Sequence, residues 1–378
     1  MKMGIMNHDA EIFRAKTDSL IRTRELTESQ LKNTELNKTE MKDGAVYLKS
    51  RPQRLVFEMT NVCNLNCVMC GRNSAEFKPV YFDKSRLSLF DDIAHQIEEV
   101  TLMGWGEPTM HPNFVEFLEW ASKHDLRKYF CTNGMKLGEL TRHIFDHDVD
   151  VIAVSVDAAN AVLNEEIRRG VDFDKVINNI KNILAKKKRL DKKWPYMNFV
   201  TTLMKKNLLE FPKIVRLAAD IGLEEVKCVY LTAFDERTKD EILYDCMDEV
   251  RIVFDEALKI ANKTGVKIKL PHIRGEDTAG DEYHKPCHAP WRDFFVGSDG
   301  YIRPCMSTPI RFLSIQEHET FDEIWNDDAF MKFRQNVNER DNMPDSCKNC
   351  YQSSHANWNR ETAFDQTGKN FSPAWGYK

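Results

Sequence analysis

The sequence predicts an α/β protein in which a parallel sheet is followed by a small cysteine-rich domain. Short runs of apolar and β-branched residues recur between residues 54 and 231, and segments with helical periodicity separate them. Strands joined in this way by helices run parallel through right-handed connections, so we expect a single sheet. Four cysteines in the last quarter of the 378 residues indicate a separate metal-binding unit.

Six apolar runs are expected to be the strands of this sheet. Their ranges are Leu55–Glu58, Val100–Met103, Lys128–Cys131, Val151–Val156, Met197–Leu203 and Val226–Leu231. The clearest helices, by period and by length, are Phe173–Lys188 and Leu208–Ala219. After the sixth strand, residues 235–264 predict a long amphipathic helix region, and Val266–Leu270 predicts one more short strand.

The chain divides into five predicted parts. Residues 1–50 are an N-terminal helical extension, residues 51–235 the sheet with its helices, and residues 236–280 a linking helix and strand. Residues 281–362 form the cysteine-rich domain, and residues 363–378 are a C-terminal tail. Within the extension, apolar positions at helical spacing predict one or two helices packed loosely on the surface.

The composition excludes several classes of protein. Apolar residues make up 42% of the chain and charged residues 30%, which is typical of a soluble protein with a sizeable core. The net charge of −5 argues against a nucleic-acid or membrane-surface partner, because such proteins are basic. The chain has no long apolar run and no signal segment at its N-terminus, so we expect a cytoplasmic protein. Its ten cysteines are then expected to be ligands or catalysts rather than disulfides.

Three of these cysteines lie within eight residues of one another. Cys63, Cys67 and Cys70 are spaced C-x3-C-x2-C, so a short loop can turn all three sulfurs inward. Thiolates are the usual ligands of iron–sulfur clusters, and a [4Fe–4S] cluster takes four. Three would leave one iron without a protein ligand, open to another molecule. A zinc knuckle is the alternative, but structural zinc takes four ligands and the loop offers no fourth.

This spacing resembles the signature of the radical S-adenosylmethionine (SAM) superfamily. The resemblance implies that the sheet is a partial (β/α)6 barrel, that the open iron binds SAM, and that the enzyme is anaerobic. Reduction of the cluster, with flavodoxin or ferredoxin as electron donor, would cleave SAM to a 5′-deoxyadenosyl radical. Barrels of this kind place their active sites at the carboxyl ends of the strands, and the next two motifs follow strands.

The second expected strand runs into Gly104, Trp105, Gly106, Glu107 and Pro108. This segment resembles the Gly-Gly-Glu-Pro element of the family, with Trp105 in the variable or second-glycine position. The resemblance implies that Gly104, Gly106, Glu107 and Pro108 contact SAM, with the carboxylate of Glu107 on its ammonium group. Glycine allows close approach of a ligand to the backbone, and a carboxylate suits an ammonium. An ordinary turn after a strand is the alternative interpretation.

The fourth expected strand ends near Ser155 and Asp157, and an Ile-Arg-Arg-Gly sequence follows. The resemblance implies that Ser155 and Asp157 meet the ribose or the carboxylate of SAM. Arg168, or else Arg169, would pair with that carboxylate through its planar fork of donors. Either arginine could equally be a solvated helix residue. Met69 stands where many members of the family carry an aromatic residue beside the adenine.

Four further cysteines, Cys287, Cys305, Cys347 and Cys350, are spaced C-x17-C-x41-C-x2-C. Four thiolates suit zinc and a cubane cluster equally, so spacing alone leaves both open. After a radical SAM barrel, this order resembles the twitch or SPASM extension, which implies an auxiliary [4Fe–4S] cluster. The segment at residues 313–327 resembles the helical part of such extensions. No cysteine follows Cys350, so the resemblance implies one auxiliary cluster, the twitch form.

Two other cysteines fall on expected strands and could donate a hydrogen atom to a substrate radical. Cys131 ends the third strand and Cys228 lies within the sixth. A radical epimerase completes its reaction by such a donation. The alternative is that each is a small buried apolar residue, as free cysteine usually is.

The main functional prediction is a radical SAM oxidoreductase that acts on a polar small molecule. It would abstract hydrogen from a C–H bond of a sugar, an aminocyclitol or a similar substrate and pass an electron to the auxiliary cluster. Enzymes of the 2-deoxy-scyllo-inosamine dehydrogenase type have a similar pattern. The alternative is a maturase or epimerase that crosslinks or epimerises a precursor peptide, or epimerises a sugar. The N-terminal part is too short for the peptide-recognition domain of many such enzymes. A non-catalytic metal-binding module is the third hypothesis.

Overall fold

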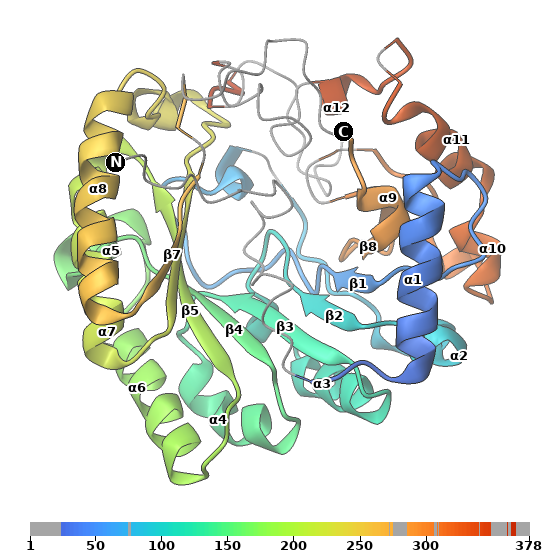
Figure 1. Cartoon of the computed structure of the whole chain (residues 1–378), viewed down its shortest axis with the longest axis horizontal. Coiled ribbons are helices and arrows are strands. Elements are labelled where there is room, and N and C mark those ends of the chain that lie inside the picture. The colour runs from blue at the N-terminus through green and yellow to red at the C-terminus, as the bar shows by residue number, and fades with distance from the viewer. Residues whose placement is uncertain are drawn as a thin grey trace.

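The computed structural model describes residues 24–74, 77–271, 273–274, 286–305, 308, 310–339, 341–348, 361 and 364–367. Within these residues the strands form one curved sheet of nine, in the order β7-β6-β5-β4-β3-β2-β1-β8-β9 (Figure 1). Every neighbouring pair is parallel except β8 and β9, which are antiparallel. The predicted α/β fold around a parallel sheet is therefore confirmed.

The seven predicted strands are present, and their ends lie within one residue of the predicted positions. The strands are β1 (Arg54–Phe57), β2 (Glu99–Leu102), β3 (Arg127–Thr132), β4 (Val151–Ser155), β5 (Tyr196–Leu203), β6 (Glu225–Tyr230), β7 (Lys267–Lys269), β8 (Asp293–Val296) and β9 (Ile302–Arg303). The last two have no counterpart among the predicted strands. They lie in the part of the chain that was expected to form a separate domain, yet β8 pairs along the whole of β1.

The helices of the described residues lie before, between and after the strands in the chain. They are α1 (Glu28–Lys42), α2 (Asp91–Ala94), α3 (Phe114–Lys123), α4 (Leu137–Asp146), α5 (Ala161–Ile167), α6 (Phe173–Arg189), α7 (Phe211–Ile221), α8 (Met247–Thr264), α9 (Ala289–Arg292), α10 (Asp322–Trp325), α11 (Asp328–Asn336) and α12 (Asp345–Lys348). Helices α3, α4, α6, α7 and α8 lie along the outer side of the curved sheet (Figure 1). None of the described helices is long and apolar enough to cross a membrane.

Three predicted helical segments are divided in the structure. The segment predicted from residue 208 begins as a 3-10 turn, Lys205–Glu210, and becomes helical only in α7. The long region predicted from residue 235 is a 3-10 turn, Glu236–Glu241, followed after a gap by α8. The segment at residues 313–327 contains only a 3-10 turn and the four-residue α10. Helical periodicity thus marked the right regions but did not resolve their interruptions.

Alternate residues of a strand point to opposite faces of the sheet, and each face carries its own apolar cluster. On β1, Leu55 and Phe57 belong to the large apolar core that includes the helices of the outer side. The inner face carries a smaller apolar cluster, which comprises Tyr129, Val151, Ala153, Tyr196 and Val200.

Buried ion pairs lie near the amino ends of the strands. Arg54 donates from Nε and Nη2 to the two carboxylate oxygens of Asp293, at 2.9 and 2.7 Å. The Nη2 of Arg127 lies 2.7 Å from Glu99 Oε2. Pairing compensates charges that would be costly to bury alone. The first of these pairs also joins β1 to β8.

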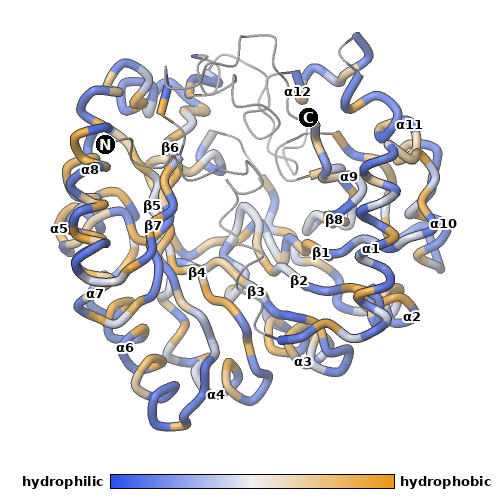
Figure 2. The backbone as a smooth tube through the Cα atoms, in the orientation of Figure 1, coloured by the Kyte–Doolittle hydropathy of each residue, from blue (hydrophilic) through white to orange (hydrophobic). Residues whose placement is uncertain are grey.

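Helix α1 is hydrophilic along most of its length (Figure 2), yet it is attached to the barrel by buried side chains. Asn37 donates to the hydroxyl of Ser50 (2.9 Å) and to the carbonyl of Trp291 (2.8 Å). The side chain of Gln30 donates to the carbonyl of Ile97 (2.8 Å). The apolar positions used to predict helices in the first 50 residues lie outside the described part, and the attachment seen here is polar and buried rather than loose.

The C-terminal domain packs around a buried tryptophan and a buried arginine. The indole of Trp325 donates to the carbonyl of Ser50 (2.8 Å), and Arg334 donates to the carbonyls of Trp325 (2.9 Å) and Pro290 (3.0 Å). Burial lowers the pKa of Arg334 to about 9. The two bonds of Arg334 hold this domain together, whereas the bond from Trp325 to Ser50 and the pairing of β8 with β1 attach it to the rest of the protein.

Candidate functional site

The loop that carries Cys63, Cys67 and Cys70 follows β1 and is held by two neighbouring segments. The backbone N–H groups of Asn66 and Val68 donate to carbonyls at the end of α5 and just beyond it, each at 2.9 Å. On the other side, the backbone N–H of residue 107 donates to the carbonyl of residue 62, also at 2.9 Å. The motifs that follow β2 and β4 therefore fix the cysteine loop from two directions.

Polar side chains that were not predicted as site residues complete this support. The amide of Asn133 donates to the side-chain oxygen of Asn64 (2.8 Å), and the amide of Asn73 donates to the carbonyl of Cys67 (2.7 Å). The guanidinium of Arg72 donates to another carbonyl of the loop at 2.9 Å. In the sequence, these residues are marked only by their position, beside the cysteines or after β3. Many other loop residues have such positions, so this did not suffice to predict them.

The three thiols lie within electrostatic range of one another. Burial raises the pKa of Cys63 and Cys67 to about 11 and also raises that of Cys70, and each thiol is affected by the charge of another. Two guanidinium groups act in the opposite direction. Arg72 lowers the pKa of Cys63 and Cys70, and Arg168 lowers that of Cys67 and Cys70. A nearby cation favours the thiolate, which is the form that binds metal.

This set of groups fits the predicted [4Fe–4S] cluster. Three thiols that converge from one loop can each bind iron, and the two arginines offset the negative charge of the thiolates. Within the described residues, no three His, Cys, Asp or Glu side chains are placed to hold a single metal ion.

The side chain of Glu107 is buried and fully engaged with its own segment and with the end of β3. Its Oε1 accepts from the N–H and the hydroxyl of Thr109 (3.2 and 2.6 Å) and from the hydroxyl of Thr132 (2.7 Å). Its Oε2 accepts from the N–H of Asn133 (2.7 Å). Burial raises the pKa of Glu107, and these hydrogen bonds oppose that effect. The predicted contact with the SAM ammonium would add to these four bonds and stays a prediction.

The two glycines of the same segment are required by packing against the β1 loop. A β-carbon at Gly106 would lie 2.3 Å from the carbonyl oxygen of Thr60 and 2.5 Å from that of Val62. A β-carbon at Gly104 would lie 2.3 Å from Cγ of Glu58. Both distances are shorter than a non-bonded contact allows. We expected glycine here because it allows a ligand to approach the backbone closely. The structure shows that glycine is also needed for this segment to pack closely against the loop after β1.

The residues predicted after β4 separate into a buried pair and an exposed arginine. Nε of Arg168 lies 2.7 Å from Oδ2 of Asp157, and both side chains are buried. The other oxygen of Asp157 accepts from the N–H of Thr202 at 2.7 Å. Burial raises the pKa of Asp157, whereas Arg168 lowers it. Ser155 is half-buried at the end of β4, and Arg169 is exposed.

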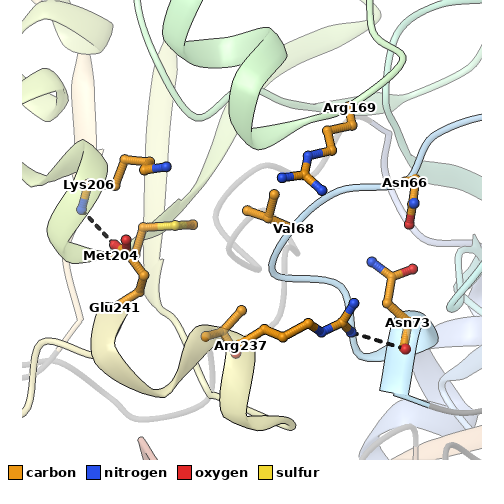
Figure 3. A pocket seen from close by; sticks show the side chains of 9 residues that line it. Asn66, Val68, Asn73, Arg169, Met204, Lys206, Arg237 and Glu241 are labelled. Carbon is orange, nitrogen blue, oxygen red and sulfur yellow. Dashed lines mark hydrogen bonds between the residues drawn. The ribbon is translucent and has the colours of Figure 1, made fainter.

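A cavity of about 200 Å³ lies beside the cysteine loop (Figure 3). Asn66 and Val68 of the loop form one part of its wall, and Met204, just after β5, forms another. Val68 and Met69 pack in one apolar cluster with Met204. Arg169 also lines the cavity, so of the two arginines considered for the SAM carboxylate, this one borders open space while Arg168 is paired.

The two candidate hydrogen donors lie on opposite faces of the sheet. Cys131 is half-buried on the inner face, with its Sγ 3.8 Å from the hydroxyl oxygen of Ser155. Cys228 is 2% exposed and packs in the core that includes the outer helices. Burial raises the pKa of both thiols. Only Cys131 therefore faces the side on which Ser155 lies.

The four C-terminal cysteines are placed in part. Cys287 precedes α9 and donates its N–H to the side chain of Asn338 (2.7 Å), Cys305 follows β9, and Cys347 lies in α12. Cys350 lies outside the described residues, so the complete set of four ligands stays a prediction.

Comparisons with known proteins identify both predicted units. Residues 57–218 match the radical SAM superfamily, and residues 287–351 match SPASM, an iron–sulfur cluster-binding domain. The first match contains Cys63, Cys67 and Cys70, and the second spans the four C-terminal cysteines. The cofactors that these domains imply are SAM, the cluster that binds it and an auxiliary iron–sulfur centre.

Three curated relatives each align over about two thirds of this chain or more. The tungsten-containing aldehyde ferredoxin oxidoreductase cofactor-modifying protein of Pyrococcus furiosus is 26% identical over 66% of this chain and 70% of its own. The AdoMet-dependent heme synthase of Methanosarcina barkeri is 26% identical over 76% and 86%. The PqqA peptide cyclase of Gluconobacter oxydans is 25% identical over 80% and 84%.

Solved structures of low sequence identity share the fold of this chain. SuiB of Streptococcus suis, bound to S-adenosylmethionine, superposes with a TM-score of 0.63 at 18% identity, over 86% of this chain and 78% of that chain. The protein anSMEcpe with bound AdoMet gives a TM-score of 0.58 at 16% identity, over 82% and 95%. At these identities the likeness concerns the fold alone.

Proposed function

The chain belongs to the radical SAM superfamily and carries a C-terminal SPASM domain, and from that premise we propose that it modifies a peptide. The observation that carries the proposal is the similarity to the PqqA peptide cyclase, which extends over 80% of this chain. This agrees better with the peptide maturase alternative than with the small-molecule oxidoreductase that was the main prediction from the sequence.

The residues of the barrel give this proposal its chemistry. When bound, SAM and its cluster supply a 5′-deoxyadenosyl radical that abstracts hydrogen from the substrate. Cys63, Cys67 and Cys70 would hold that cluster, with the buried Arg168 close to its charge. The inner face beside Cys131, where the strands end, would receive the peptide. Flavodoxin or ferredoxin as electron donor stays part of the proposal.

A second candidate is the modification of a small cofactor or its precursor. The similarities to a cofactor-modifying protein and to a heme synthase favour it, since they extend over 66% and 76% of this chain. These two relatives are as similar to the chain as the peptide cyclase is, so substrate tests must include both classes.

The test supplies the reconstituted enzyme with SAM, a reductant and either short peptides encoded beside its gene or porphyrin precursors. We expect 5′-deoxyadenosine formation to rise only with a peptide, together with a change in peptide mass or, in deuterated water, carbon-bound deuterium. Product formed from a porphyrin precursor, with peptides inert, would instead establish the second candidate. Changing Cys347 to Ala should leave 5′-deoxyadenosine formation partly intact while product falls, if the auxiliary centre acts after abstraction.

A further inference from the structure

Glu58 is a buried carboxylate next to the candidate site that the predicted site residues did not include. It follows β1 immediately, on the way to the cysteine loop, and its side chain has no exposed surface. An ionised carboxylate in such a place needs hydrogen-bond donors, because burial alone disfavours the charged form. Burial does raise the pKa of Glu58, and the hydrogen bonds described next act against this effect.

The two oxygens of Glu58 bind segments that are nearly 200 residues apart in the sequence. Oε1 accepts from the N–H of Trp105 at 2.9 Å. Oε2 accepts from both the N–H and the hydroxyl of Ser298, each at 3.1 Å. Trp105 stands between the two glycines of the SAM motif, and Ser298 lies in the turn between β8 and β9 of the C-terminal domain. One side chain thus connects the two domains.

Each of these segments leads to a set of cluster cysteines. From Trp105, the chain continues through Gly106 to residue 107, whose N–H binds the cysteine loop at 2.9 Å. From Ser298, it continues to Asp299, whose carboxylate pairs with Arg303 at 2.6 Å. Arg303 also lies within electrostatic range of Glu58, and Cys305 follows two residues later. One path from the first cysteine set to the second therefore passes through this carboxylate, in addition to the backbone pairing of β1 with β8.

The packing around this carboxylate leaves little room for it to move. A β-carbon at Gly104 would lie 2.3 Å from Cγ and 3.0 Å from Oε1 of Glu58. A shift of the β8–β9 turn must therefore either break the bonds to Ser298 or draw the carboxylate away from Trp105. Hydrogen bonds to an ionised carboxylate are stronger than those between neutral groups, so either change is costly.

We propose that Glu58 is a positioning residue that couples the auxiliary cluster domain to the SAM motif after β2. Loss of order at the auxiliary site then weakens SAM binding, although no auxiliary cysteine contacts SAM. The coupling rests on the family assignment and on the geometry, and it holds whatever the substrate is.

The test is a thermodynamic cycle on the full reconstituted chain, with SAM as the probe. The dissociation constant of SAM is measured for the wild type, Cys305→Ser, Glu58→Gln and the double variant. Glutamine keeps the shape of Glu58 but turns an NH₂ group toward either Trp105 or Ser298, so it should break at least one of the three hydrogen bonds. We expect Cys305→Ser to weaken SAM binding about fivefold or more in the wild type and less than about twofold with Glu58→Gln.

Hydrogen exchange supplies a second measurement that does not depend on turnover. Glu58→Gln should accelerate exchange in residues 104–107 and 297–300 together. Asp150→Asn is the matched control, because Asp150 is also buried and accepts a backbone N–H, from Lys128 at 2.8 Å, but at the other end of the strands. It should leave the effect of Cys305→Ser unchanged. If Glu58→Gln does not fold, Ser298→Ala removes one of the three bonds and should reduce the coupling.

Two results would overturn the proposal. The first is a dissociation constant of SAM that does not respond to Cys305→Ser in the wild type, because there would then be no coupling. The second is an equal response with and without Glu58→Gln or Ser298→Ala. Iron analysis of each variant verifies that the cluster held by the barrel is retained.

Discussion

Arg168 and Asp157 form an ion pair inside the barrel, with Nε of the arginine 2.7 Å from Oδ2 of the aspartate. The aspartate side chain is fully buried and that of the arginine is 10% exposed. Arg168 also lies close enough to Cys67 and Cys70 to lower the pKa of both thiols. The pair therefore belongs both to the packing of the barrel and to the surroundings of the cluster.

Changing Asp157 to Asn should destabilise the protein strongly. The guanidinium of Arg168 would stay buried without its counter-charge, which costs about 3–5 kcal/mol in other proteins. The matched control is Asp146→Asn, which breaks the exposed pair with Arg142 and should cost less than about 1 kcal/mol. Denaturant unfolding of both variants measures the difference. Equal losses would show that the buried pair contributes no more than an exposed one.

Changing Gly106 to Ala should displace the cysteine loop, because the added methyl group would meet two backbone carbonyls at 2.3 and 2.5 Å. Backbone cannot move aside as a side chain can, so we expect lower iron content in the barrel cluster and a loss of about 1–3 kcal/mol. Gly138→Ala is the control, since its nearest neighbour is the side-chain oxygen of Asn179 rather than backbone. Iron content equal to that of the wild type would contradict the proposed packing role.

Seven cysteines should hold two clusters, which corresponds to about eight iron atoms per chain if both are [4Fe–4S]. Replacing Cys63, Cys67 and Cys70 together with Ala should leave about four and abolish cleavage of SAM. Anaerobic reconstitution followed by iron, sulfide and zinc analysis measures this. Zinc retained at the C-terminal cysteines would disprove the auxiliary cluster.

Cys131→Ala should reduce product formation more than Cys228→Ala. Only Cys131 is half-buried on the inner face, near Ser155, whereas Cys228 belongs to the core that includes the outer helices. If the reaction ends with donation of hydrogen from a thiol, deuterium from the solvent should enter the product in the wild type and be lost with Cys131→Ala. A larger effect of Cys228→Ala would contradict the assignment of the two faces.

Lys128 should make stability depend on alkaline pH. Burial, with a further contribution from Arg24, lowers the pKa of Lys128 to about 8 from its usual 10.5. Between these values the unfolded chain holds a proton that the folded protein has lost, so stability rises with pH. Below pH 8, the free energy of unfolding of Lys128→Met should exceed that of the wild type. This difference should decrease by about 3 kcal/mol between pH 8 and 10.5, because only the wild type gains stability in that range. Lys123→Met, on the surface of α3, should leave the profile unchanged.

The strands of the barrel could be predicted from the sequence because their apolar runs are bounded by clear helices. In contrast, β8 and β9 could not be placed. Strand β8 is only four residues long and begins with the charged Asp293, and nothing local indicates a partner as distant as β1. The C-terminal domain was therefore predicted as a separate unit, although its first strand extends the barrel sheet.

Those parts of the candidate site in which the residue type determines the chemistry could be predicted from the sequence. The hydrogen-bond partners and the burial of its side chains could not, because they depend on contacts between distant segments. The spacing of the three cysteines identified their loop. The sequence could not show that Glu107 has four internal donors, or that Arg168 is paired while Arg169 is exposed. Glu58 was not predicted as a site residue, because nothing in the sequence distinguishes it from other glutamates at strand ends. Its role depends on its distant partners Trp105 and Ser298.

The pairing of β8 with β1 constrains how the protein can be made. The two strands are joined by Arg54 and Asp293, which are 239 residues apart, so β1 emerges from the ribosome long before its neighbour is synthesised. During that time one edge of β1 has open hydrogen-bonding groups, a state that favours association with other chains. Contacts this distant also slow folding. Expression at low temperature or with chaperones should therefore increase the yield of native protein, and chains terminated before β8 should aggregate.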